Sequence, residues 1–172
     1  MANTYVPIAT TTVGSGGTTT IEFASIPQTY TDLKIVVSAR MDRAVTRQSL
    51  NVWFNNSTGS WTGRRLAGYD SSSVLSDVAS TTYYQIPQGT GTSATASTFS
   101  NSEYYIPNYT SSNNKSILSD SVTENNSITA WISDLGAGLW SNTAAITSIK
   151  IDGNGYNFLQ YSTITLYGIK KN

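Results

Sequence analysis

Hydrophobic and polar residues alternate with a period of two along much of this chain. Residues 32–40, with the sequence DLKIVVSAR, place Leu33, Ile35 and Val37 on one face and mostly polar side chains on the other. Such alternation is typical of a strand that is buried on one face only. Similar or weaker alternation recurs in residues 18–25, 49–55, 81–87, 103–109, 114–123, 127–133, 145–152 and 162–169. The chain is therefore expected to form about nine or ten short strands.

Segments rich in glycine, asparagine and serine separate these strands and supply the residues that turns require. Asn154 and Gly155 both tolerate the positive φ of a type I′ turn, so a tight hairpin is expected there. Two segments do not follow the alternation. Residues 41–48 (MDRAVTRQ) fit a long loop or one helical turn. Residues 71–80 (SSSVLSDVAS) fit a short helix capped by Ser73 about as well as a segment without a helix.

Short strands at spacings of about ten residues, without amphipathic helices between them, are typical of antiparallel sandwiches and barrels. The 172 residues fit a single domain. We expect an all-β fold, an antiparallel β-sandwich with a jelly-roll-like arrangement, although an immunoglobulin-like sandwich fits almost as well. Because Pro7 cannot donate to a sheet, residues 1–17 are expected to form an N-terminal edge strand or arm, and residues 18–172 the sandwich.

The expected surface is polar but carries little charge. Charged residues make up only 12% of the sequence, and ten Lys and Arg balance ten Asp and Glu. Without net charge there is no long-range field to attract nucleic acid or an anionic membrane, so neither is expected as a partner. The N-terminus does not resemble a secretion signal, and no run of about 18 apolar residues suggests a membrane span.

The residue types that most catalytic and metal sites use are scarce. The chain has no His and no Cys, which argues against most enzyme classes and against a transition metal. The sequence alone cannot pair any two of the ten carboxylates, as a glycosidase would need. Residues 152–157 (DGNGYN) begin like a calcium loop but lack the closing glutamate, so a hairpin is expected instead. No enzymatic activity, metal or other cofactor is therefore expected.

The segment WTGRRLAGY, residues 61–69, concentrates residue types that are enriched at protein interfaces. Trp61 and Tyr69 can stack on a partner, and Arg64 and Arg65 can form bidentate pairs with carboxylates. A protein interface or a glycan contact would use these groups. An edge strand followed by a turn explains the same residues without a binding role, and it is the simpler interpretation.

Eleven tyrosines and four tryptophans form the second unusual feature. In residues 101–117 (SNSEYYIPNYTSSNNKS), alternation sends Tyr104 to one face of a strand and Tyr105 to the other, and Pro107 ends the strand. The loop that follows is expected to contact a neighbouring subunit. Core and seam packing is the favoured role of the aromatic residues, with a carbohydrate platform as the alternative. The candidate interaction surface consists of Tyr5, Pro7, Trp61, Arg64, Arg65, Tyr69, Tyr105, Asn108 and Tyr109.

Five longer phrases occur in order between residues 5 and 169: YVPIATTTVGSGGTTTIEFASIPQTYTDLKIVVSAR, FSNSEYYIPNYTSSNNKSI, SVTENNSITAW, LWSNTAAITSIKI and YSTITLYGI. Together they resemble β-rich virion structural proteins of tailed phages, particularly those of marine and cyanobacterial hosts. In that group the module looks to occur as a small free-standing virion protein and as the terminal part of longer fibre proteins. The resemblance therefore implies a place in the virion, after assembly in the cytoplasm of a bacterial host.

The resemblance and the chain length together favour a non-enzymatic capsid decoration (cement) protein that contacts the major capsid protein. The 172 residues leave no room for a separate stalk, which disfavours a complete fibre. Such a protein is expected to be a homo-oligomer, with a homotrimer favoured. The alternative is a tail-fibre or head-fibre receptor-binding module that attaches to host-surface polysaccharide. A polysaccharide depolymerase is the least favoured hypothesis, since the chain lacks His.

Overall fold

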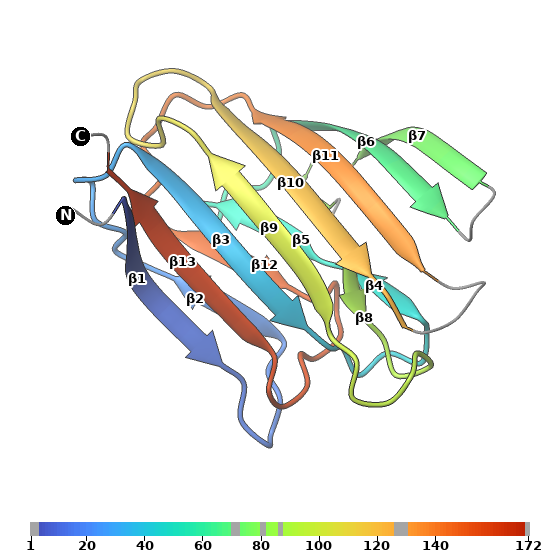
Figure 1. The fold of residues 1–172 in the computed structure, drawn as a ribbon. Helices are drawn as coiled ribbons and strands as arrows, with labels where there is room; N and C mark the ends of the chain where they lie inside the picture. Colours follow the sequence, from blue (N-terminus) through green and yellow to red (C-terminus); the bar gives the residue numbers. More distant parts are fainter. Residues whose placement is uncertain (1–3, 70–72, 80–81, 86–87, 126–130, 171–172) are drawn as a thin grey trace.

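The computed structural model describes residues 4–69, 73–79, 82–85, 88–125 and 131–170, and within them it contains strands and loops but no helix. Eight strands form one antiparallel sheet, in the order β1-β13-β3-β9-β10-β11-β6-β7 (Figure 1). Their bounds are β1 Tyr5–Thr12, β3 Asp32–Ala39, β6 Trp61–Tyr69, β7 Ser73–Ala79, β9 Ser100–Ile106, β10 Lys115–Thr123, β11 Ile132–Trp140 and β13 Thr163–Ile169.

The other strands form a second layer, which lies behind the large sheet in Figure 1. Three of them form a sheet in the order β2-β12-β5, and the other two form the pair β4-β8. Their bounds are β2 Thr20–Phe23, β4 Arg47–Ser49, β5 Asn51–Phe54, β8 Gln88–Thr90 and β12 Ile149–Asp152. The prediction of an all-β, antiparallel β-sandwich is confirmed. The jelly-roll connectivity expected within that class stays a prediction.

The period-two pattern of the sequence becomes an alternation of burial in the large sheet. In β3 the side chains of Leu33, Ile35 and Val37 are completely buried. Burial in β10 alternates over all nine of its residues. The inward apolar side chains of the large sheet and those of the second layer form one core. Burying this apolar surface is the main favourable contribution to folding.

An aromatic cluster lies in the core between the two layers. Trp61 of β6 and Trp140 of β11 stack with their ring centres 6.3 Å apart, and Phe54 of β5 lies 4.9 Å from Trp61. Tyr84 lies 6.1 Å from Trp61 on ring centres. Each of these four side chains is at most 1% exposed. The cluster therefore joins the second layer to the half of the large sheet that contains β6 and β11.

Strand β1 forms one edge of the large sheet, and β13 is the strand that pairs with it. The register shifts between Pro7 and Ala9, which marks a β-bulge. A proline near a bulge in an edge strand is expected, because proline has no N–H to donate to a neighbouring strand. Bulges and prolines also discourage an edge strand from pairing with a foreign strand.

The structure shows the conformation of the segments for which the sequence left alternatives open. Residues 73–79 form strand β7, so the helix considered for residues 71–80 is wrong. Pairing with β6 stabilises the extended conformation there. Residues 42–46 form bends without a helical turn, and β4 follows them. The turn at Asn154 and Gly155 is confirmed, since φ is 54° and 88° at these residues.

Two predicted strands differ from the structure. In the segment 81–87, Tyr84 makes an isolated bridge with Val52, and the described residues form no longer ladder there. The prediction of a strand in residues 127–133 falls partly on residues outside the described ranges. In the part that the structure describes, β11 begins at Ile132 and continues well beyond the predicted segment.

Candidate functional site: the outer face of the large sheet

The face of the large sheet that points away from the second layer is not covered by any described segment (Figure 1). Four leucines of the neighbouring strands β10, β11 and β6 lie exposed on this outer face. Their exposed fractions are 53% for Leu66, 49% for Leu118, 50% for Leu135 and 39% for Leu139. We call these four residues the leucine patch.

The strand register brings the members of the leucine patch together. Leu135 lies opposite Leu66 across the β11–β6 pair, and Leu118 lies opposite Ala137, between Leu135 and Leu139 on β11. Side chains that are opposite each other in a sheet have Cβ atoms only about 5 Å apart. Single exposed leucines are common on protein surfaces, but a contiguous group is typical of an interaction site.

Three tyrosines surround Lys34 on the other half of the outer face. Tyr105 of β9 and Tyr167 of β13 lie opposite Lys34 on its two sides. The Lys34 amine lies 5.8 Å from the centre of the Tyr5 ring. Tyr5, Lys34, Val36 and Tyr167 line a shallow hollow of about 240 Å³. We call Tyr5, Tyr105 and Tyr167 the tyrosine cluster.

The carboxylate of Asp32 positions one member of this cluster. It accepts hydrogen bonds of 2.8 Å from the Tyr105 hydroxyl and from the backbone N–H of Asn108. The hydrogen bond to Asp32 is the main cause that raises the pKa of Tyr105 above its usual value. Asp32 thereby fixes the Tyr105 ring and the start of the loop after β9 relative to each other.

Two carboxylates lie beside the point where the tyrosine cluster meets the leucine patch, at Tyr105 opposite Leu118. Glu103 of β9 is opposite Asp120 of β10, and both line a hollow of about 150 Å³. Lys34 forms a 2.6 Å ion pair with Glu103, which balances one of the two charges.

Among the described residues there is no group of three or more potential metal-binding side chains. The described residues also form no helix long and apolar enough to cross a lipid bilayer.

The residues predicted for an interaction surface divide between surface and core. Trp61 and Tyr109 are buried, so the prediction that they contribute to a surface is wrong. Trp61 belongs to the aromatic cluster, and the Tyr109 hydroxyl donates to the carbonyl of Pro27. The side chain of Tyr69 is outside the described part. The exposed candidates are Tyr5, Pro7, Arg64, Tyr105 and Asn108.

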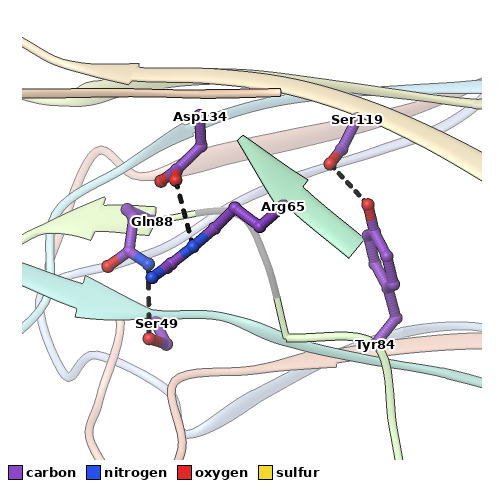
Figure 2. A network of polar contacts seen from close by, with 6 residues as sticks. All are labelled: Ser49, Arg65, Tyr84, Gln88, Ser119 and Asp134. Atoms are coloured by element: carbon purple, nitrogen blue, oxygen red, sulfur yellow. Dashed lines mark hydrogen bonds and ion pairs between the residues drawn. The ribbon is translucent and has the colours of Figure 1, made fainter. Parts of the chain in front are cut away.

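Arg65, also predicted for the surface, points into the space between the layers (Figure 2). Its Nε lies 3.6 Å from Oδ1 of the fully buried Asp134, and the two residues form an ion pair. Tyr84 and Ser119 share a buried 2.7 Å hydrogen bond nearby, between Oη and Oγ. The prediction of an exposed Arg65 is therefore wrong. At this end of the sheet the strands β6, β10 and β11 direct polar side chains inward, namely Arg65, Ser119 and Asp134.

Lys115 is a buried lysine, which is uncommon outside functional sites, and it is not among the residues predicted from the sequence. It is buried, and its amine donates hydrogen bonds to the carbonyls of Ser111, Asn113 and Thr143. Burial lowers the pKa of Lys115. The amine joins the loop after β9 to the segment after β11, so its role is structural. The expectation that this loop contacts a neighbouring subunit stays a prediction.

The raised pKa values of two buried tyrosines predict how the free energy of unfolding depends on pH. Burial raises the pKa of Tyr84 and of Tyr104 above that of an unfolded tyrosine, which is about 10. The unfolded chain therefore loses these protons at a lower pH than the folded protein. The contribution of each tyrosine is complete below pH ~10 and falls as the pH rises from there towards the folded-state pKa.

The substitution Tyr84→Phe isolates one of these contributions. Above pH ~10, the free energy of unfolding of the wild type should fall more steeply than that of the variant, by about 1.4 kcal/mol per pH unit. Urea denaturation between pH ~8 and ~11 measures both slopes. Equal slopes for the two proteins would show that Tyr84 ionises as readily in the folded state as in the unfolded one.

The sequence did reveal several exposed members of the outer face, but it did not reveal the leucine patch. The alternation in β11 was the available signal, since residues 132–140 read ISDLGAGLW. Its apolar Leu135 and Leu139 point outward, whereas Asp134 and two glycines point inward.

Comparison of the chain with family models, with curated proteins and with solved structures finds no match.

Proposed function

We propose that this chain is a non-enzymatic structural protein of a tailed-phage virion, a capsid decoration subunit that binds the major capsid protein. The observation that supports this most is the uncovered outer face of the large sheet, with its leucine patch and its tyrosine cluster. An apolar and aromatic surface of this kind is typical of protein interfaces. The resemblance of the sequence to virion proteins supports the choice of this class of assembly.

The tyrosine cluster is the part of the face that we assign to the capsid. Tyr5 and Tyr105 are exposed, and Asp32 already restrains Tyr105, so little side-chain freedom would be lost on binding. Tyrosine supplies a large apolar area together with a hydroxyl that can form a hydrogen bond. Pro7 and Asn108 lie exposed on strands or loops next to these rings and would form the rim of the contact.

Copy number in purified particles tests the proposed function. Quantitative mass spectrometry should find this chain in hundreds of copies per virion, because a decoration protein follows the capsid lattice. The double variant Tyr5→Ser/Tyr105→Ser should lower its occupancy on particles at least about tenfold. Tyr161→Ser is the matched control, since Tyr161 is an exposed tyrosine outside the cluster. A handful of copies per particle would contradict decoration.

A receptor-binding module is the second candidate, and the hollow beside Tyr5 and Tyr167 favours it. Exposed tyrosine rings next to Lys34 and Glu103 could stack on a sugar and form hydrogen bonds with its hydroxyls. In that case a glycan array should show binding that is lost in Tyr105→Ala and kept in Tyr161→Ala. Absence of binding to glycans and to host cells would count against this candidate.

A further inference from the structure

Two charged residues accompany the leucine patch. Asp120 lies directly opposite Leu135, and Arg64 lies directly opposite Ala137. Both are exposed. The Arg64 guanidinium donates a hydrogen bond to the carbonyl of Gly63, and among the described residues neither charge takes part in an ion pair.

The sheet keeps these two charges apart within one chain. Asp120 is on β10 and Arg64 is on β6, with β11 between them. Along the strands they also differ by two residues, since Asp120 shares a row with Leu135 and Arg64 shares the next row with Ala137. With strands about 4.8 Å apart and a rise of about 3.4 Å per residue, their Cα atoms are about 12 Å apart. This acid and this base flank the apolar centre of the patch on opposite sides.

We propose that the leucine patch binds a second copy of this chain, face to face, about a two-fold axis that passes between Leu135 and Ala137. Such an axis lies in the plane between the two sheets and exchanges the positions of Asp120 and Arg64. Each carboxylate of one copy then faces the guanidinium of the other, and two symmetric ion pairs form.

The same two-fold axis brings apolar side chains together. Leu66 of one copy faces the neighbourhood of Leu135 on the other, and Leu118 faces the neighbourhood of Ala137. An isologous interface needs one surface that is complementary to itself, and an acid and a base placed on either side of an apolar centre provide this. Apolar burial supplies the affinity, and the charges fix the orientation of the two copies.

The proposed dimer rests on the proposed function, because it identifies one binding partner of the outer face that the proposed function already uses for assembly. Tyr105 lies opposite Leu118 and would come under the edge of this dimer, whereas Tyr167 on β13 and Tyr5 on β1 lie farther from the patch and remain available for the capsid. The dimer also replaces the trimer that the resemblance suggested with a two-fold arrangement. The dimer can be tested on the purified chain in solution, and capsid occupancy can be tested on particles, so each can fail without the other.

Charge reversal is the decisive experiment. Sedimentation velocity of the purified full chain, from about 5 to about 200 μM, should show a concentration-dependent shift to twice the monomer mass. Asp120→Arg and Arg64→Asp should each weaken self-association at least about tenfold, because like charges would then face each other. An equimolar mixture of the two variants should restore dimers, since each pair of facing charges is again opposite in sign. Circular dichroism should confirm that both variants remain folded.

Glu22→Arg is the matched control, because Glu22 is an exposed carboxylate on β2, in the other layer. This variant should associate like the wild type. A wild type that stays monomeric over the whole range, or forms trimers, would overturn the proposal. Dimers that resist both charge reversals would also overturn it, and so would a mixture of the two variants that fails to associate.

Discussion

Replacing Trp61 by alanine should lower the free energy of unfolding by about 3–5 kcal/mol, as expected for the loss of a fully buried tryptophan. The ring stacks on Trp140 and packs against Phe54, so its removal leaves a cavity between the layers. A domain of this size has a total stability of only about 5–15 kcal/mol. Urea denaturation followed by circular dichroism measures the change.

Tyr105→Ala is the matched control for this variant, because Tyr105 is a partly exposed aromatic residue of the same sheet. Its substitution should cost no more than about 1 kcal/mol, the loss of one exposed hydrogen bond and some contact area. The two variants separate a core role from a surface role. A Trp61→Ala protein as stable as the wild type would contradict the central place of this ring in the core.

The substitution Asp134→Ala should have the second large effect, about 3–5 kcal/mol, because it removes one partner of a buried ion pair. Asp134 is completely buried, and Arg65 lies 3.6 Å from its carboxylate (Figure 2). Without Asp134 the guanidinium would keep its charge in an interior from which water is largely excluded. The measurement is the free energy of unfolding at neutral pH.

The double variant Arg65→Met/Asp134→Leu tests whether the loss comes from an unbalanced charge. Removing both charges with side chains of similar volume should leave the protein more stable than Asp134→Ala alone. In the cycle closed by the single variants Arg65→Met and Asp134→Leu, the loss in the double variant should be smaller than the sum of the two single losses by more than about 1 kcal/mol. Additive losses would mean that the two side chains stabilise the fold independently of each other.

Much of the sheet could be predicted from the sequence, because local alternation and tertiary burial agree there. In β3 the apolar positions Leu33, Ile35 and Val37 are also the inward ones. The prediction that Tyr104 and Tyr105 point to opposite faces is confirmed, since Tyr104 is completely buried and Tyr105 is exposed. Pro107 lies just beyond the end of β9, as its missing N–H requires.

The same rule is ambiguous in β6, because each face of this strand carries both an arginine and an apolar side chain. Trp61 and Arg65 point inward, whereas Arg64 and Leu66 point outward. Alternation shows which residues share a face, but it cannot show which face meets the core when each carries an arginine. The pairing of Arg65 with Asp134, a residue far away in the sequence, decides the orientation.

Strand β11 shows why the leucine patch was missed. Its inward positions include Gly138, where a Cβ atom would lie 2.5 Å from the Tyr84 ring and 2.8 Å from Ile117. The ring therefore needs a glycine beneath it, and the apolar side chains on either side of Gly138 and Gly136, Leu139 and Leu135, lie on the outside. The sequence alone does not show that the Tyr84 ring occupies the space next to Gly138, because only tertiary packing brings these two residues together.

The position of β13 has a consequence for synthesis. It is the last strand of the chain, yet it lies between β1, the first strand, and β3. Tyr5 is opposite Ile169, so β1 has no partner in the large sheet until β13 has left the ribosome. At a translation rate of about 5–20 residues per second, the edge of β3 stays open for seconds. The nascent chain is therefore expected to expose unpaired strand edges until β13 has emerged.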